Sequence, residues 1–297
     1  MKGLMLHCGG LPATFEEIAQ VELPVATETY RPIPHGDIVR LVEEEMYHRF
    51  RLRKNDRAFG LNNQGNQMFG VLKYDLFSPD NPDVDIEQFL QMRDNLTVDQ
   101  LKQYGLSIGV RNSYDKTITA ALAGGLNTFV CDNLCFHGDF FTIMRKHTKN
   151  SWDDLVPMVM TAVRSAAIHY TQTVKFQEHM KLVPCSLERG YEVIGRARGT
   201  GLITPTQCNE IIDVWRICVR HHHDNVKKGE TPHTFRDHGD NAYGLFNSFT
   251  HGLKLGNIRR KMDEYTGVSS MFQELGLSPN ELPPAEEAKL IEDAVLV

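Results

Sequence analysis

The apolar residues of this chain change their spacing near residue 150, and that change constrains the fold more than any other feature. Before it lie short apolar runs bounded by turn residues, such as QMFGVLKY at 67–74. After it, apolar residues recur at helical spacing, as at Leu155, Val159 and Ala162. A period of two indicates strands, and a period of 3.6 indicates helices. The sequence therefore predicts an α+β protein, with an antiparallel sheet in its strand-rich N-terminal half and a helical C-terminal half.

The first half is expected to hold one helix, over about 35–49, and a set of strands. The linker NNQGN at 62–66 tolerates positive φ and predicts a hairpin, and Gly124-Gly125 predicts a later turn. The expected strands are 57–61, 67–74, 106–111, 117–122 and 127–136.

The second half is expected to hold four helices. The first begins near Trp152, and the second has the clearest start, with Thr204 as cap, Pro205 at the first position and Gln207 closing a capping box. Two more follow, from about Asn241 and Asn257. The predicted organisation is an extended N-terminal arm (1–34), a sheet-rich core (35–150), a helical part packed on the sheet (151–267) and an acidic tail (268–297).

Composition narrows the class of protein. The 297 residues carry a formal charge of −6, which argues against a uniformly basic nucleic-acid binder but allows a basic patch. The six cysteines are scattered and predict reduced thiols rather than disulfides. The sequence has no run of eighteen apolar residues and no signal peptide, so we expect a cytoplasmic protein without a membrane span.

Three short motifs, supported by a weaker Asn-rich helix, place the chain near a known group of proteins. The three motifs are RNSYDK (111–116), VCDN (130–133) and RKHT (145–148), and the helix is NAYGLFNSFTHGLK (241–254). The chain resembles, over about 35–265, a phage/plasmid-like protein family of unassigned function. The resemblance implies a mobile-element protein expressed in the cytoplasm of a bacterial host, and it transfers no catalytic mechanism.

Two groups of residues have metal-ligand chemistry. Cys131, Cys135 and His137 would suit zinc but lack a fourth ligand, so two buried thiols on a strand are the favoured interpretation. The region from His221 to His238 offers a site built from two histidines and a carboxylate, or else a solvated helix end and loop. Its candidates are His221, His222, His223, Asp224, His233, Asp237, His238 and Asp240.

Residues 107–150 are dense in polar groups. Asp115, Asp132 and Asp139, with Lys116 or Lys146, are compatible with a Mg²⁺ nuclease centre. Asp and Asn at strand ends are also ordinary turn residues. We favour turn chemistry with a basic rim at 145–148. No nucleophile elbow, phosphate loop or dinucleotide fingerprint is present, so the sequence leans against an enzyme and indicates no cofactor.

The basic residues are clustered and lie close to aromatic residues. Arg and Lys for phosphates, with aromatics for base stacking, are typical of proteins that hold single strands without reading their sequence. The alternative is a set of solvated faces backed by core aromatics. The residues predicted to bind nucleic acid are Arg49, Arg51, Arg53, Arg111, Lys116, Arg145 and Lys146.

Three functions follow as hypotheses. The first is a nucleic-acid-binding accessory protein in phage or plasmid DNA replication or recombination, with single-strand annealing as its most concrete form. The second is a counter-defence or host-takeover protein that binds a host or phage protein, with the acidic tail as a contact. The third is a metal-dependent nuclease or hydrolase. A homo-oligomer is expected under the first two.

Overall fold

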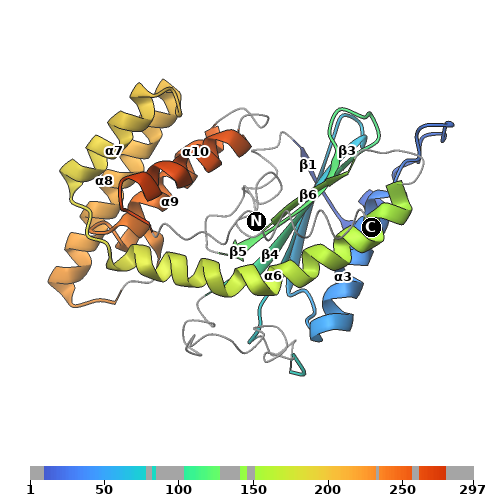
Figure 1. Ribbon diagram of the computed structural model, residues 1–297, viewed down its shortest axis with the longest axis horizontal. Coiled ribbons are helices and arrows are strands. Elements are labelled where there is room, and N and C mark those ends of the chain that lie inside the picture. Colours follow the sequence, from blue (N-terminus) through green and yellow to red (C-terminus); the bar gives the residue numbers. More distant parts are fainter. Residues whose placement is uncertain are drawn as a thin grey trace. The chain divides into compact units, whose positions relative to one another are not determined.

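The computed structural model describes residues 10–77, 82–84, 104–127, 141–145, 151–231, 234–255 and 261–278. The protein is α+β, as the sequence predicts, and its described residues form two compact units (Figure 1). Unit 1 contains the described residues up to Thr173, and unit 2 contains the described residues from Val174 onward. The long helix α6 (Ser151–Leu182) begins in unit 1 and ends in unit 2. The spacing of apolar residues changes where α6 begins. The boundary between the two units, in contrast, lies inside α6, after Thr173.

Unit 1 is built on an antiparallel sheet whose strands follow one another in sequence order. The predicted hairpin is confirmed: β2 and β3 are joined by residues 63–66, of which Asn63, Gln64 and Gly65 have positive φ. The described strands are β1 (Leu11–Ala13), β2 (Asp56–Asn62), β3 (Gln67–Tyr74), β4 (Gly105–Ser113), β5 (Ala120–Asn127) and β6 (Phe141–Arg145).

The turn predicted at Gly124-Gly125 is wrong. Both glycines lie inside β5, where Gly124 pairs with Ile108 of β4 and with Phe141 of β6. Strands on both sides complete the hydrogen-bonded ladder, so tertiary pairing overrides the local preference of two glycines for a turn. Beyond Asn127, the strand expected over 127–136 lies outside the described residues, and β6 was not predicted.

The extended arm predicted for residues 1–34 is also wrong in part. Besides β1 it contains the short helix α2 (Phe15–Gln20), which starts at a capping box. The Thr14 hydroxyl accepts from the Glu17 N–H, and the Glu17 carboxylate accepts from the Thr14 N–H. This two-way bond satisfies two donors that the helix start would otherwise leave open.

Helix α3 (His35–Phe50) packs on the sheet through Ile38, Val39, Val42 and Met46, all buried. The register places Leu106, Ile108, Val110 and Asn112 on one face of β4, and the Asn112 amide reaches the start of α3. Buried apolar side chains of this size stabilise a fold by roughly 1.5–3 kcal/mol each. The first part of α6 joins unit 1 through the Tyr170 hydroxyl, which donates to the Tyr104 carbonyl.

Unit 2 is helical and surrounds Trp215, which is fully buried. Gly190 contacts the indole so closely that a Cβ there would lie 2.1 Å from Trp215 Nε1. The predicted capping box at Thr204 and Gln207 is confirmed, whereas α7 was not predicted. The elements are the end of α6, α7 (Leu187–Gly199), α8 (Pro205–Lys228), η1 (Phe235–Asp237), α9 (Ala242–Gly252), η2 (Leu253–Leu255) and α10 (Lys261–Glu274).

None of the helices in the described ranges is both long and apolar enough to cross a lipid bilayer.

Candidate functional site

The RNSYDK motif forms a buried polar network at the N-terminal end of α3. Asn112 Nδ2 donates to the Ile33 carbonyl at 2.7 Å and lies 2.9 Å from His35 Nδ1. His35 Nε2 lies 2.9 Å from the Gly65 carbonyl. A carbonyl only accepts, so Nε2 carries the proton and Nδ1 accepts from Asn112. The neutral His35 ring thus joins β4, α3 and the β2–β3 turn.

Tyr114 closes this network. Its ring stacks on His35 at 3.9 Å between centroids, and its hydroxyl accepts from the His35 N–H at 3.0 Å. The Tyr30 hydroxyl donates to the Tyr114 carbonyl at 2.9 Å. Burial raises the pKa of Tyr114 to about 12. These buried, mutually bonded groups hold the N-terminal residues against the sheet, which is a structural role.

The Asp115 carboxylate accepts hydrogen bonds that stabilise the turn after β4, which is the interpretation that the sequence favours. This carboxylate accepts from Asn63, Gln67 and Thr117. Partial burial raises the pKa of Asp115, but the hydrogen bonds outweigh this effect and leave that pKa below its usual value. Asp132 and Asp139, the other acids of the hypothetical nuclease centre, lie outside the described residues.

The structure brings no metal site together within the described ranges: no three His, Cys, Asp or Glu side chains there are placed to hold an ion. His222 Nδ1 lies 3.1 Å from the Asp237 carbonyl, and Asp237 accepts instead from Asn225 and Thr234. Cys131, Cys135, His137 and His233 lie outside the described residues, as does the acidic tail from 279 onward.

Exposed arginines gather at the opposite, C-terminal end of α3. Arg51 and Arg53 are exposed, and Leu52 between them is fully buried, which turns both arginines outward. Their guanidinium carbons lie 5.5 and 5.0 Å from the centre of the Tyr47 ring. The Tyr47 hydroxyl accepts a hydrogen bond from Arg53, and this bond with the nearby charge lowers the pKa of Tyr47. Arg49 comes two positions after Tyr47 in α3, so it lies on another side of the helix, over the Phe50 ring. We call Arg51 and Arg53 the arginine cluster.

The backbone conformation of Arg51 lowers the stability of the fold. Arg51 has φ 55° and ψ 23°, a left-handed conformation that ends α3, and its N–H donates to the Tyr47 carbonyl. Glycine is the usual residue at such a position, and a residue with a Cβ loses roughly 1 kcal/mol there. Arg51 therefore places a long cationic side chain where glycine would make the fold more stable.

A second helix contributes a cation that the sequence analysis missed. Burial lowers the pKa of the Arg49 guanidinium, and the charge of Arg164 on α6 lowers it further, against the opposing effect of Glu45. Two guanidinium groups within electrostatic reach of one another create a field that attracts an anion. Arg164 lies more than a hundred residues from Arg49 in the chain, so no local pattern could have paired them.

Two neighbouring cations share one carboxylate and do not belong to the cluster. Lys54 and Arg57 both bind Glu43, at 2.8 and 3.2 Å. Arg57 also lies over the Phe15 ring, at 4.4 Å from its centre. A single carboxylate thus separates Lys54 and Arg57 from the exposed Arg51 and Arg53.

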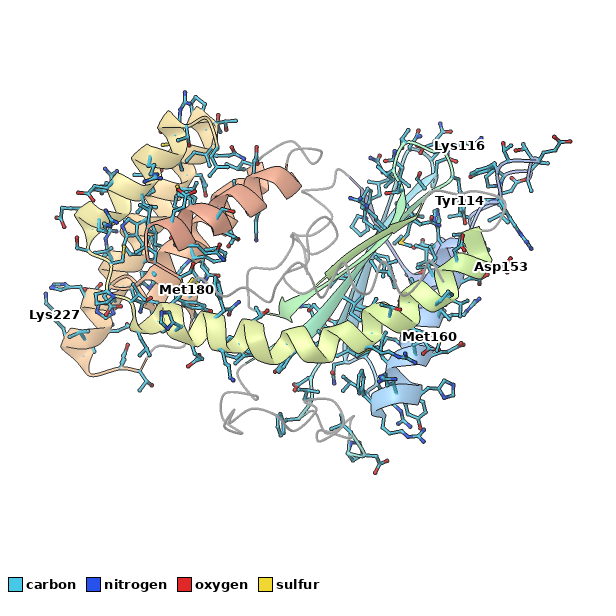
Figure 2. All side chains as sticks on the ribbon, viewed as in Figure 1. Tyr114, Lys116, Asp153, Met160, Met180 and Lys227 are labelled. Atoms are coloured by element: carbon cyan, nitrogen blue, oxygen red, sulfur yellow. The ribbon has the colours of Figure 1, made fainter. Side chains whose placement is uncertain are left out.

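The other predicted residues do not join this cluster. Lys116 lies over the Tyr30 ring, beside Tyr114 and thus at the N-terminal end of α3, which is about 22 Å long (Figure 2). Arg111 is half-buried within β4, paired with Phe69 and Ala121. Arg145 ends β6, where its backbone pairs with Ala120, and Lys146 lies outside the described residues.

Comparison with protein-family models, with curated proteins and with solved structures finds no match for this chain.

Proposed function

We propose that this protein binds single-stranded nucleic acid through the arginine cluster, as an accessory factor in the DNA replication or recombination of a mobile element. One observation carries the proposal: Arg51 and Arg53 stand exposed around Tyr47, while Lys54 and Arg57 close by share the carboxylate of Glu43. Exposed guanidinium groups beside an aromatic ring are suited to phosphates and stacked bases.

The residue types favour a single strand over a duplex. Guanidinium planes and tyrosine rings stack on bases, which are accessible only when the strand is unpaired. Arg49 and Arg164 add positive charge from α3 and α6, and Arg51 and Arg53 supply exposed guanidinium donors for phosphate oxygens. The cluster contains no group arranged for bond cleavage, so the proposed role is binding.

Fluorescence anisotropy with a labelled single-stranded oligonucleotide at several salt concentrations tests the proposal. The R51Q/R53Q variant should bind more weakly than the wild type. Because each lost phosphate contact reduces the dependence of log K on log salt by about 0.7 for single strands, its slope should be shallower by roughly 1.4.

The matched control is R189Q/R196Q, which removes the same charge from exposed ion pairs on α7. It should retain the wild-type slope. If the wild type shows no salt-sensitive binding below micromolar protein, or if the two variants bind alike, the arginine cluster is not a nucleic-acid site.

A further inference from the structure

Helix α8 continues well past the core that it helps to build. Cys218 is its last buried side chain, and every residue from Val219 to Lys228 is exposed or half-buried. Apolar packing explains most helices in proteins, since isolated helical turns are marginal in water. The last turns of α8 therefore depend on other contacts.

Polar contacts brace one face of this projecting end. Asn225 Nδ2 donates to Asp237 Oδ1 at 2.8 Å, and His222 Nδ1 lies 3.1 Å from the Asp237 carbonyl. Asp237 is only 8% exposed and also accepts from the N–H and the hydroxyl of Thr234. A nearly buried carboxylate with this many partners fixes the helix end against η1.

The opposite face carries basic residues at helical spacing. Arg216, Arg220, His223 and Lys227 follow one another at intervals of four, three and four, which places them on one stripe of α8. All four are exposed, and Lys227 marks the outer end of the helix (Figure 2). We call them the α8 basic stripe.

The stripe is open to a ligand. Within the described part of the chain, Arg220, His223 and Lys227 have no hydrogen-bond or ion-pair partner. Arg216 Nε donates to the Tyr191 hydroxyl at 2.7 Å and has only a distant carboxylate, that of Asp213 at 3.8 Å. The row of hydrogen-bond donors on α8 thus lies next to the aromatic ring of Tyr191 on α7.

We propose that the α8 basic stripe is a second contact surface for the phosphodiester backbone of nucleic acid. This inference rests on the proposed function and extends it to unit 2. From Arg216 to Lys227 the stripe spans about 16 Å along the helix, enough for several successive phosphates. Because Asp237 already fixes the end of α8, binding there costs less conformational entropy. Tyr191 offers a ring for base stacking.

The R220Q/K227Q variant tests the inference in the full chain, because neither side chain has a described partner whose loss would disturb folding. With the same labelled oligonucleotide, its salt slope should be shallower than that of the wild type by roughly 1.4. The control R189Q/R196Q removes the same charge from α7, on the helix face turned away from Tyr191, and should keep the wild-type slope. Equal thermal midpoints would show that both variants are folded.

The outcomes separate the two proposals. If R51Q/R53Q weakens binding while R220Q/K227Q behaves like its control, the stripe is not a contact surface and the proposed function stands. If the wild type binds no oligonucleotide, both proposals fail. If R220Q/K227Q binds labelled polyglutamate more weakly than the wild type but binds the oligonucleotide with the wild-type slope, the stripe accepts acidic polypeptides, and its assignment to phosphates is overturned.

Discussion

The two ends of α3 use polar side chains in opposite ways. At the N-terminal end, His35, Asn112 and Tyr114 are buried and bonded to one another. At the C-terminal end, Arg51 and Arg53 are exposed and surround one tyrosine. At the N-terminal end, hydrogen bonds within the protein replace hydrogen bonds to water, and this stabilises the fold. The C-terminal end leaves charge available to a partner.

Their tyrosines show the same contrast. Burial raises the pKa of Tyr114 to about 12, whereas the hydrogen bond from Arg53 lowers the pKa of Tyr47. A dense set of polar residues in a sequence therefore does not identify a binding site. What distinguishes the two ends is whether the polar groups are buried within the fold or remain exposed to a partner once the chain has folded.

The largest expected effect is on stability, at the buried end. In Asn112→Leu, the Ile33 carbonyl and His35 Nδ1 lose their donor, and an unsatisfied buried group costs about 1–3 kcal/mol. We expect the free energy of unfolding in urea to fall by about 3 kcal/mol. Asn209→Leu, at an exposed position on α8, is the control and should change it by less than about 0.5 kcal/mol. Equal effects of the two variants would contradict a structural role for the network.

Alkaline pH should weaken the same end. Tyr114 has a pKa of about 12 in the folded chain against 10.0 for a free phenol, and the pKa of Tyr30 is also raised. A phenol that holds its proton more tightly when folded stabilises the fold below pH 10. That contribution is lost as the pH rises from 10 toward 12. Urea unfolding at a series of pH values measures it, and stability that stays constant through this window would contradict it.

The smallest effect on stability is expected at the exposed end, with the opposite sign. Arg51→Gly relieves a left-handed conformation and should raise the free energy of unfolding by roughly 0.5–1 kcal/mol while weakening oligonucleotide binding. Lys116→Gly is the matched control, since Lys116 has φ 62° at the other end of α3. It should raise stability similarly and leave binding unchanged. Weaker binding in Lys116→Gly alone would move the site to the N-terminal end.

Local signals made much of the fold predictable. Thr204, Pro205 and Gln207 mark the start of α8, and the run Asn62 to Asn66 marks the hairpin, because caps and turns depend on a few adjacent residues. The same signal is present at Thr14 and Glu17, where α2 begins. Helix α7 could have been found from the helical spacing of its buried residues Val193, Ile194 and Ala197.

Features that depend on tertiary contacts were not predictable. The strand through Gly124 and Gly125 exists because β4 and β6 flank it. For the site, the sequence pointed to Arg49, Arg51 and Arg53, of which the structure places Arg51 and Arg53 around Tyr47. It could not show that Glu43 binds both Lys54 and Arg57, or that the charge of Arg164 acts on Arg49, because each pairing joins separate elements.

Amide hydrogen exchange of the full chain, with and without a saturating single-stranded oligonucleotide, tests the contrast between the two ends of α3 most directly. We expect exchange to slow in peptides covering 47–54, and also in 216–228 if the α8 basic stripe takes part. Peptides covering 112–118, in the buried network, should exchange at the same rate in both samples. Protection confined to 112–118, or no protection at 47–54 under saturating conditions, would contradict the account.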